Sequence, residues 1–401
     1  MPNSWNLGCP SSALPHRPTT TTVKTMYETI RKRIVRSIRR ATLCAPLLAA
    51  ARPVGGQAPP DSSITKEVLG EGIYLFRAPS ALDLWSATNV VVIVGDEDVT
   101  VFDSNTRPAT ARKVIAEIRK LTNKPVRTLI NSHWHMDHWS GNGEYVKAFP
   151  GVRIVATTES RDYMKRMGPA FFVDEVHVPR ARATLDTALR TGKQRDGSML
   201  TDSVRRAMER DVEDAASFAR EIAANPRVLP NFVYRDTLIF WSGTRELRLM
   251  SETGDASAST VLYLPREKLL VTGDVLVSPE DGKGPPPWTT NSYSITPWLR
   301  SLRSFEALDV TTIVPGQGPA FHDKAYLTVT ANLFAAIIGQ VHDALEHGAV
   351  TIGDVQALVN VDAIGRQYTP GAGAPDPAFR DLVAGLVKKV FSESLDGIGH
   401  Y

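Results

Sequence analysis

Cysteine is nearly absent from this chain of 401 residues: its two cysteines, Cys9 and Cys44, both lie near the amino terminus. The remainder of the chain therefore forms no disulfide of its own and offers no thiolate to a metal ion. A metal site there must be built from histidine, carboxylate or amide ligands. Cys44 follows Ala41-Thr-Leu, without the small neighbouring residue that is typical of a lipid-anchored cysteine.

Long apolar runs are missing as well. The apolar segment 41–51 holds eleven residues, whereas a helix needs about 20 to cross a bilayer. No later segment is predicted to be long enough, so we expect no stable membrane span and exclude a polytopic membrane protein.

Excess positive charge is confined to the first part of the chain. Residues 1–60 carry a net charge of +8, whereas residues 61–401 carry −5. The sequence pI of 8.8 is therefore a property of the amino-terminal segment, and it gives no support to nucleic-acid binding. A small-molecule substrate is the expected partner, and the sequence leaves the oligomeric state open.

The amino-terminal segment has the composition of an export signal. A basic region, residues 31–40, precedes the apolar residues 41–51, and the small residues at 55–58 offer cleavage positions. We expect residues 1–60 to form a largely disordered leader that is cleaved near 51–58, which predicts a periplasmic or extracellular protein. The alternative is an organellar transit peptide or a disordered tail on a cytoplasmic protein, because the segment is rich in arginine and poor in acidic residues.

The remaining pattern predicts two strand-and-helix halves separated by a charged helical insertion. Strands are expected at residues 73–76, 89–94, 99–102, 126–130, 152–156, 237–240, 247–250, 259–264 and 269–272. Helices are expected at residues 112–121, 199–224, 298–308, 323–346, 352–360 and 376–394.

Three histidines and one aspartate fall within six residues, in the segment His133-Trp-His135-Met-Asp137-His138. The preceding residues 126–130 are typical of a buried strand, so these side chains are expected at its carboxyl end. They converge only if the strand runs into a turn. Imidazole and carboxylate ligands suit zinc, iron and manganese, with zinc the first choice for a hydrolytic site. The segment predicts a metal site, and histidines of a surface loop are the alternative.

This spacing, with the small-residue turn Ser140-Gly-Asn-Gly143 after it, resembles the metallo-β-lactamase superfamily. Segments ending in Asp103, in Asp274 and in Gly318 agree with that family in order. The resemblance covers about residues 66–325 and implies an α/β fold, a four-layer αβ/βα sandwich with metals at one edge of the facing sheets. The expected domain is residues 61–325, with a helical insertion at about 162–235 and a helical C-terminal extension at 326–401.

The resemblance also implies a ligand set, which departs from the family at its third histidine. His133 and His135 match the first two ligands, and Asp255 stands where the third histidine is usual, eight residues before Tyr263. An aspartate oxygen is an acceptable zinc ligand, so Asp255 is expected to complete the first site. Asp274 is expected to bridge two ions.

At the second site the departure weakens the ligand set. Asp137 and His138 match the family, but Gln317 occupies the place of the last histidine in Gly316-Gln317-Gly318. A neutral amide oxygen is a poorer ligand for such a metal. His322 is the alternative ligand at this position. Asp103 is expected to orient a histidine rather than to bind metal.

Four aromatic residues are candidates for the substrate pocket. Trp134 and Trp139 flank the ligands, and Trp288 and Tyr293 lie in the proline-rich loop that follows Asp274. The alternatives are aromatic packing beneath the motif for the first two and a merely stiff connection for the loop.

The implied function is a metal-dependent hydrolase, in which hydroxide bound to one or two ions attacks a carbonyl-type bond. Zinc is the expected ion, with iron or manganese possible, and Asp137 is the candidate catalytic residue as acceptor of the nucleophile's proton. Lactams, lactones, esters and thioesters are the expected substrates, ahead of phosphodiesters and sulfate esters. A degenerate binding protein is the second hypothesis, because Asp255 and Gln317 replace histidines. A diiron redox protein ranks third, since such relatives usually carry glutamate in place of His135.

Overall fold

The computed structural model describes residues 64–78, 88–167, 173–279, 282, 284, 294–368, 375 and 377–398. All of these belong to one compact unit, residues 50–401. The expected leader, residues 1–60, lies outside the described residues.

The first sheet has seven strands in the order of the chain. Its strands are β1 (Thr65–Gly70), β2 (Ile73–Arg77), β3 (Val90–Val94), β4 (Val99–Phe102), β5 (Val126–Ile130), β6 (Arg153–Thr157) and β7 (Phe232–Tyr234). Neighbours from β1 to β4 are antiparallel, and those from β4 to β7 are parallel. Because β4 and β5 are parallel, the loops that leave their carboxyl ends lie at the same edge of the sheet.

The second sheet has five strands in the order β12-β11-β10-β9-β8. They are β8 (Thr237–Ser242), β9 (Arg245–Glu252), β10 (Ser259–Leu264), β11 (Leu269–Gly273) and β12 (Thr312–Pro315). Only β11 and β12 form a parallel pair. Their carboxyl ends lead into Asp274 and Gln317, respectively.

Three hydrophobic clusters define four layers. One cluster joins the sheets face to face, with Val91 and Ile130 from the first sheet and Leu249 and Leu262 from the second. On the outer face of the first sheet, α2 (Pro108–Leu121) and α4 (Asn142–Ala148) cover a second cluster. On the outer face of the second sheet, α8 (Ile295–Ala307) and α9 (Ala325–Glu346) cover a third. The molecule is therefore the αβ/βα sandwich that the sequence predicts.

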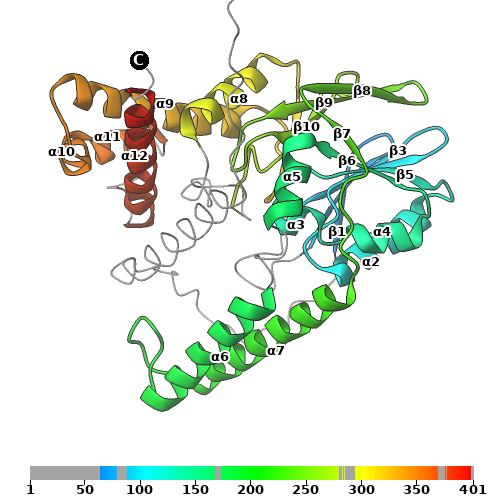
Figure 1. Ribbon diagram of the computed structural model, residues 1–401, viewed down its shortest axis with the longest axis horizontal. Helices are drawn as coiled ribbons and strands as arrows, with labels where there is room; N and C mark the ends of the chain where they lie inside the picture. The colour runs from blue at the N-terminus through cyan, green and yellow to red at the C-terminus, as the bar shows by residue number, and fades with distance from the viewer. Residues whose placement is uncertain are drawn as a thin grey trace, which may run out of the picture. The chain divides into compact units, whose positions relative to one another are not determined.

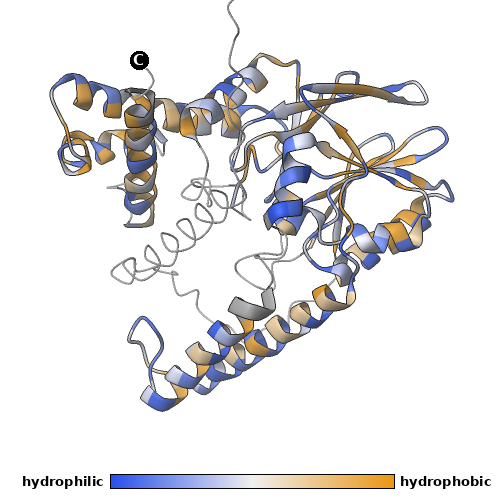
Figure 2. Ribbon diagram, viewed as in Figure 1, coloured by the Kyte–Doolittle hydropathy of each residue, from blue (hydrophilic) through white to orange (hydrophobic). Residues whose placement is uncertain are grey.

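The insertion between β6 and β7 is helical, with α5 (Thr158–Met167), α6 (Val173–Thr191) and α7 (Asp202–Ala224). The last two pack against each other (Figure 1). Hydrophilic residues are frequent on these helices, whereas the strands are mostly hydrophobic (Figure 2). Arg107, just before α2, anchors α7 through ion pairs of 2.6 Å to Asp214 and 2.7 Å to Glu221.

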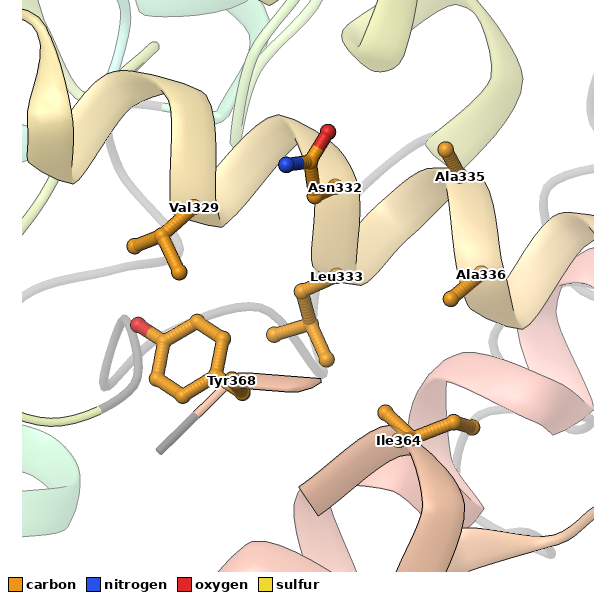
Figure 3. Close-up of a pocket in the computed structure, with 7 residues that line it drawn as sticks. All are labelled: Val329, Asn332, Leu333, Ala335, Ala336, Ile364 and Tyr368. Atoms are coloured by element: carbon orange, nitrogen blue, oxygen red, sulfur yellow. The ribbon is translucent and has the colours of Figure 1, made fainter. Parts of the chain in front are cut away.

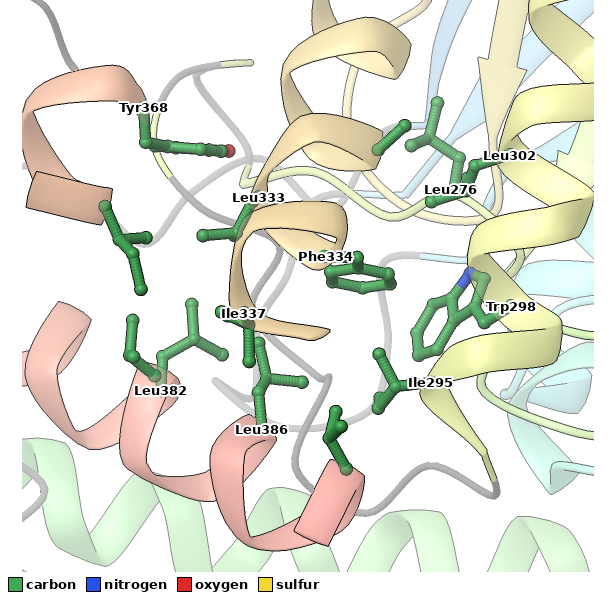
Figure 4. Close-up of a cluster of buried hydrophobic side chains, with 14 of the residues drawn as sticks. Leu276, Ile295, Trp298, Leu302, Leu333, Phe334, Ile337, Tyr368, Leu382 and Leu386 are labelled. Carbon is green, nitrogen blue, oxygen red and sulfur yellow. The ribbon is translucent and has the colours of Figure 1, made fainter. Parts of the chain in front are cut away.

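The C-terminal region is helical, as predicted, and continues after α9 with α10 (Ile352–Leu358), α11 (Val361–Tyr368) and α12 (Pro377–Ile398). Side chains from α8, α9 and α12 share one core, which includes Trp298, Phe334 and Leu386 (Figure 4). Contrary to the sequence expectation, α9 is long and apolar enough to cross a membrane by length and composition alone. Its buried Phe334 and Ile337 place it instead as a helix within this core.

A pocket of about 510 Å³ lies in the same helical region. It is lined by Val329, Asn332, Leu333, Ala335 and Ala336 of α9 and by Ile364 and Tyr368 of α11 (Figure 3). None of these lining residues is a candidate metal ligand, so the pocket is separate from the site described next.

Candidate metal centre

The histidine motif occupies the sharp connection between β5 and the single-turn helix α3 (Met136–Trp139). Two asparagines close this connection, because Asn131 and Asn142 exchange side-chain hydrogen bonds of 3.0 and 2.8 Å. Sequence reasoning did not predict this pair, since both residues only flank the motif. Its effect is to hold the imidazoles of His133 and His138 fully buried.

One group of potential ligands comprises His133, His135, Asp255 and Asp274, whose ligand atoms all lie within 4.8 Å of one another. We call this the first cluster. His135 Nδ1 lies 3.2 Å from Asp255 Oδ2, and His133 Nε2 lies 3.9 Å from Asp274 Oδ2. Asp255 thus stands with the motif histidines, where the sequence predicts the third ligand.

The second cluster comprises Asp137, His138 and Asp274. His138 Nε2 lies 3.0 Å from Asp137 Oδ2 and 3.3 Å from Asp274 Oδ2. Because Asp274 belongs to both clusters, the two sites share a carboxylate, as the prediction of a bridging aspartate requires.

The buried polar atoms of both clusters fit a divalent cation. Among the described residues, His133 Nε2 and Asp274 Oδ1 are buried and have no hydrogen-bond partner. Buried polar atoms without a partner are costly, and a bound cation would satisfy both. Imidazole and carboxylate donors without sulfur suit zinc, iron or manganese.

Asp103 contacts His138 at Nδ1, the ring nitrogen that does not face the second cluster. This position suits the orienting role expected for Asp103. Its Oδ2 lies 2.7 Å from His138 Nδ1, and its Oδ1 accepts a 2.7 Å hydrogen bond from the Ser132 backbone N–H. Its backbone is left-handed, with φ of 60°, a conformation that aspartate tolerates better than most residues. These contacts direct His138 Nε2 towards the cluster.

Gln317 reaches the second cluster, but through its amide nitrogen. Gln317 Nε2 donates to Asp137 Oδ2 at 3.2 Å, and Thr88 Oγ1 donates to the same oxygen at 3.1 Å. The sequence carried no signal for Thr88, because its approach to Gln317 depends on a backbone bridge between distant segments.

His322 does not substitute for Gln317, and this expectation is wrong. Its side chain is 68% exposed, and its Nε2 lies 3.6 Å from Glu67 Oε1 on β1. The four residues between the two positions carry the chain past Pro319 to a backbone bridge between Phe321 and Ile313, and His322 then lies beside β1.

The aromatic candidates differ in their placement. Trp139 is 4% exposed and donates to the Trp134 backbone oxygen at 2.9 Å, so it packs beneath the motif and does not line a pocket. Trp134 is half-buried beside His135, and its ring stacks on Tyr163 with centroids 5.7 Å apart. Tyr163, in α5, was not predicted. Trp288 and Tyr293 lie outside the described residues.

The pKa values of the two fully buried histidines are shifted in opposite directions. Burial lowers the pKa of His133 well below its usual range, and the neighbouring His138 and His135 lower it further, so this ligand is neutral. For His138, burial is outweighed by Asp137, Asp274 and Asp103, which raise its pKa well above the usual range. Burial would raise the pKa of Asp137, but His138 lowers it to about 2. A cation at this cluster would therefore displace the His138 proton.

Fold and site together define a class. Residues 83–317 match the sequence profile of the Metallo-beta-lactamase superfamily, which covers more than half of the chain, and the chain belongs to that superfamily. This membership supports a hydrolase.

Among individual proteins, the chain is similar to the linear primary-alkylsulfatase of Pseudomonas sp., with 24% identity over 252 residues. That match covers 63% of this chain and 45% of the relative, so the chain spans about half the length of the curated protein it matches. The solved sec-alkylsulfatase Pisa1 from Pseudomonas sp. shares the fold with a TM-score of 0.50 and 16% identity, over 82% of this chain and 50% of that one. The DIM-1 metallo-β-lactamase superposes with a TM-score of 0.46 and 15% identity, over 68% and 97% of the two chains.

Proposed function

We propose that this protein is a metal-dependent hydrolase of ester bonds, with zinc as its ion and alkyl sulfate esters as its substrate class. The observation that carries the proposal is the pair of buried His/Asp clusters that share Asp274. The names of the two relatives support our choice of sulfate esters over the carbonyl-type bonds expected from the sequence. Lactams, lactones, carboxylic esters and thioesters remain the comparison substrates.

The residues of the two clusters have two roles, metal binding and proton acceptance. When bound, divalent cations supply Lewis-acid activation of water and stabilise developing negative charge. His133, His135 and Asp255 would hold one ion, Asp137 and His138 the other, and Asp274 would contact both. Asp137, kept in place by Thr88 and Gln317, is the candidate acceptor of the proton that the attacking water loses.

An apolar surface beside the first cluster supports an alkyl substituent on the substrate. Trp134 and Tyr163 stack next to His135, with 4.2 Å between the ring centroids of Trp134 and His135. Both residues are half-buried, so part of each is exposed. An alkyl chain packed against them would gain burial energy of about 0.8 kcal/mol for each CH₂ group.

The test is release of inorganic sulfate from linear alkyl sulfates by the zinc-loaded protein, beside a panel of chromogenic lactams and carboxylic esters. We expect sulfate release that rises with chain length and disappears in His133→Ala. Hydrolysis of the panel without sulfate release would retain the hydrolase and reject the substrate class. A metal-loaded protein without any turnover would reject the enzyme.

A binding protein with a degenerate site is the second candidate, and the amide hydrogen bond from Gln317 to Asp137 favours it. Under this hypothesis the loaded protein binds alkyl sulfates without hydrolysing them. Isothermal titration beside the sulfate assay separates the two functions.

We also propose export, with residues 1–60 as the leader and cleavage near 51–58. An organellar or cytoplasmic location is the alternative. Cell fractionation of the full chain, with amino-terminal sequencing of the product, tests it. An uncleaved cytoplasmic chain would reject export.

A further inference from the structure

The two ligand clusters are unequal, and the inequality centres on Gln317. The first cluster gathers four ionisable side chains, among them the imidazoles of both His133 and His135. The second gathers three, of which His138 is the one imidazole, and it shares Asp274 with the first. Since affinity for a divalent ion depends on the number and kind of donors, the first cluster is the stronger.

The amide of Gln317 does not supply the missing donor. Its nitrogen, not its oxygen, is the atom that contacts the cluster, at 3.2 Å from Asp137 Oδ2. If the amide were turned around, its oxygen would face a carboxylate oxygen, and two acceptors would oppose each other. Without a cation, the donating orientation is therefore the stable one.

The loop that carries Gln317 leaves the residue little freedom to move. A Cβ atom at Gly316 would overlap Asp274 Oδ1, and one at Gly318 would overlap Ser278 Oγ. Asn89 Nδ2 also donates to the backbone oxygens of Pro315 and Gly318, at 2.7 and 2.9 Å. The backbone of Gln317 is thus held in place, with its amide beside Asp137.

Asp137 is consequently an occupied acceptor. Its Oδ2 already receives hydrogen bonds from Thr88 and Gln317. A cation that binds this oxygen must displace or reorient at least one of these donors, and this lowers its affinity further. The same bonds hold the carboxylate in place when the second ion is absent.

We propose that the protein binds its two metal ions with unequal affinity: a firmly held ion in the first cluster and an exchangeable one in the second, with Gln317 as the residue that sets the difference. The proposal rests on the metal-dependent function above. It assigns Gln317 as a competitor for Asp137 and not as a metal ligand. We expect the two dissociation constants to differ by at least about tenfold.

The test is a zinc titration of the metal-free protein against a chromogenic chelator, with metal content after dialysis measured by mass spectrometry. We expect two binding steps, and about one ion per chain after dialysis. Gln317→His should tighten the second step by at least about tenfold and bring the retained content near two, because a histidine adds a ligand. Gln356→His, on the exposed face of α10, is the matched control and should leave both steps unchanged.

Gln317→Ala separates a competitor from a ligand. It removes a donor from Asp137, so the second step should tighten, whereas loss of a ligand would weaken it. Circular dichroism checks that each variant is folded, and the alanine variant serves if the histidine variant is not. Two equal steps in the unmodified protein, or an unchanged or weakened second step in the alanine variant, would overturn the inference and leave the hydrolase intact. Absence of any zinc binding would overturn both.

Discussion

Asp255 is the residue on which the first cluster depends most, because it replaces a histidine with a shorter, charged ligand. It is 7% exposed, and its carboxylate contacts His135 at 3.2 Å. The backbone also links it to the shared aspartate, since Asp255 N–H donates to Asp274 O at 3.3 Å. A change here therefore acts on the metal directly.

Asp255→Ala should weaken the tighter zinc-binding step by at least about 100-fold, because a ligand is lost from a closed set. Competition titration measures it, and Asp255→His should restore most of the affinity. Asp343→Ala, an exposed aspartate of α9, is the control and should have no effect. Unchanged occupancy in Asp255→Ala would remove this residue from the site.

Asp103→Asn should weaken zinc binding at the second cluster by about tenfold to 100-fold. The variant keeps the size of the side chain but loses the charge that orients His138 through the 2.7 Å contact. Zinc titration followed by circular dichroism distinguishes a lost orientation from a lost fold. If the second step is unaffected while the fold is intact, His138 is oriented by other contacts.

The sequence could bring the candidate ligands together because the motif is local: one turn carries four of them, and Asp255 and Asp274 follow strands of the second sheet. Partners that arrive from distant segments could not be predicted in this way. Thr88 and Tyr163 reach the site only through packing of the two sheets and of α5, and no spacing in the chain reports those contacts. The prediction for His322 was wrong for the converse reason. It lies near Gln317 in the chain, but its side chain lies beside Glu67 instead.

At the scale of elements, α7 is tied to the metal edge of the first sheet by Arg107, together with a 2.7 Å hydrogen bond from Asn225 Nδ2 to the Ser140 backbone oxygen. Arg107 lies between Asp103 and α2, and its guanidinium packs 5.5 Å from the Phe218 ring centre while it pairs with Asp214 and Glu221. Glu221 also accepts a hydrogen bond from the Ala109 N–H at the start of α2. Movement of α7 would therefore also move the loop between β4 and α2. That loop carries Asp103, which contacts His138.

Arg107→Ala should lower the free energy of unfolding by about 1–3 kcal/mol, because two partly buried carboxylates lose their partner. Urea unfolding measures the loss, and faster proteolytic cleavage within α6 and α7 should accompany it. Arg220→Ala breaks the exposed pair with Glu213 and should cost under about 0.5 kcal/mol. Equal effects of the two variants would show that Arg107 is no anchor.

Elements with strong apolar periodicity were predicted to within a few residues, and weak ones were missed. β10 and β11 are buried along their whole length and read clearly as strands. β1 is largely exposed and polar, and β7 has three residues. Neither therefore has an apolar pattern that distinguishes it from a loop in the sequence. The pairing partner decides such strands, and the partner is not visible in the local sequence.

For the whole molecule, the C-terminal helices share a core with the second sheet and are not an appendage. Phe334 is fully buried, and its ring meets Trp298 of α8 with centroids 5.1 Å apart. Trp298 in turn donates to the Val275 backbone oxygen at 2.8 Å, one residue after Asp274. The core therefore extends to the metal site.

Phe334→Ala should destabilise the protein by about 3–5 kcal/mol through the cavity it leaves. Because the core is continuous, tryptophan fluorescence and far-UV circular dichroism should report one coincident transition. Leu358→Ala, at a side chain that is 58% exposed, should change stability by less than about 0.5 kcal/mol. Separate transitions in Phe334→Ala would show that the helices unfold on their own.

The ligands come from both halves of the chain, and this has a mechanical consequence. Four of the candidate ligands follow β5 of the first sheet: His133, His135, Asp137 and His138. The other two follow strands of the second sheet, Asp255 after β9 and Asp274 after β11. A bound ion would thus link the two sheets at one edge of the sandwich. Neither sheet alone supplies all the donors of either cluster. Zinc at 100 times its dissociation constant should add about 2.7 kcal/mol of stability. Thermal unfolding with and without EDTA measures this gain, and an unchanged melting temperature would contradict it. The metal-free protein would then unfold at a lower temperature than the metal-loaded one, whether or not substrate is present.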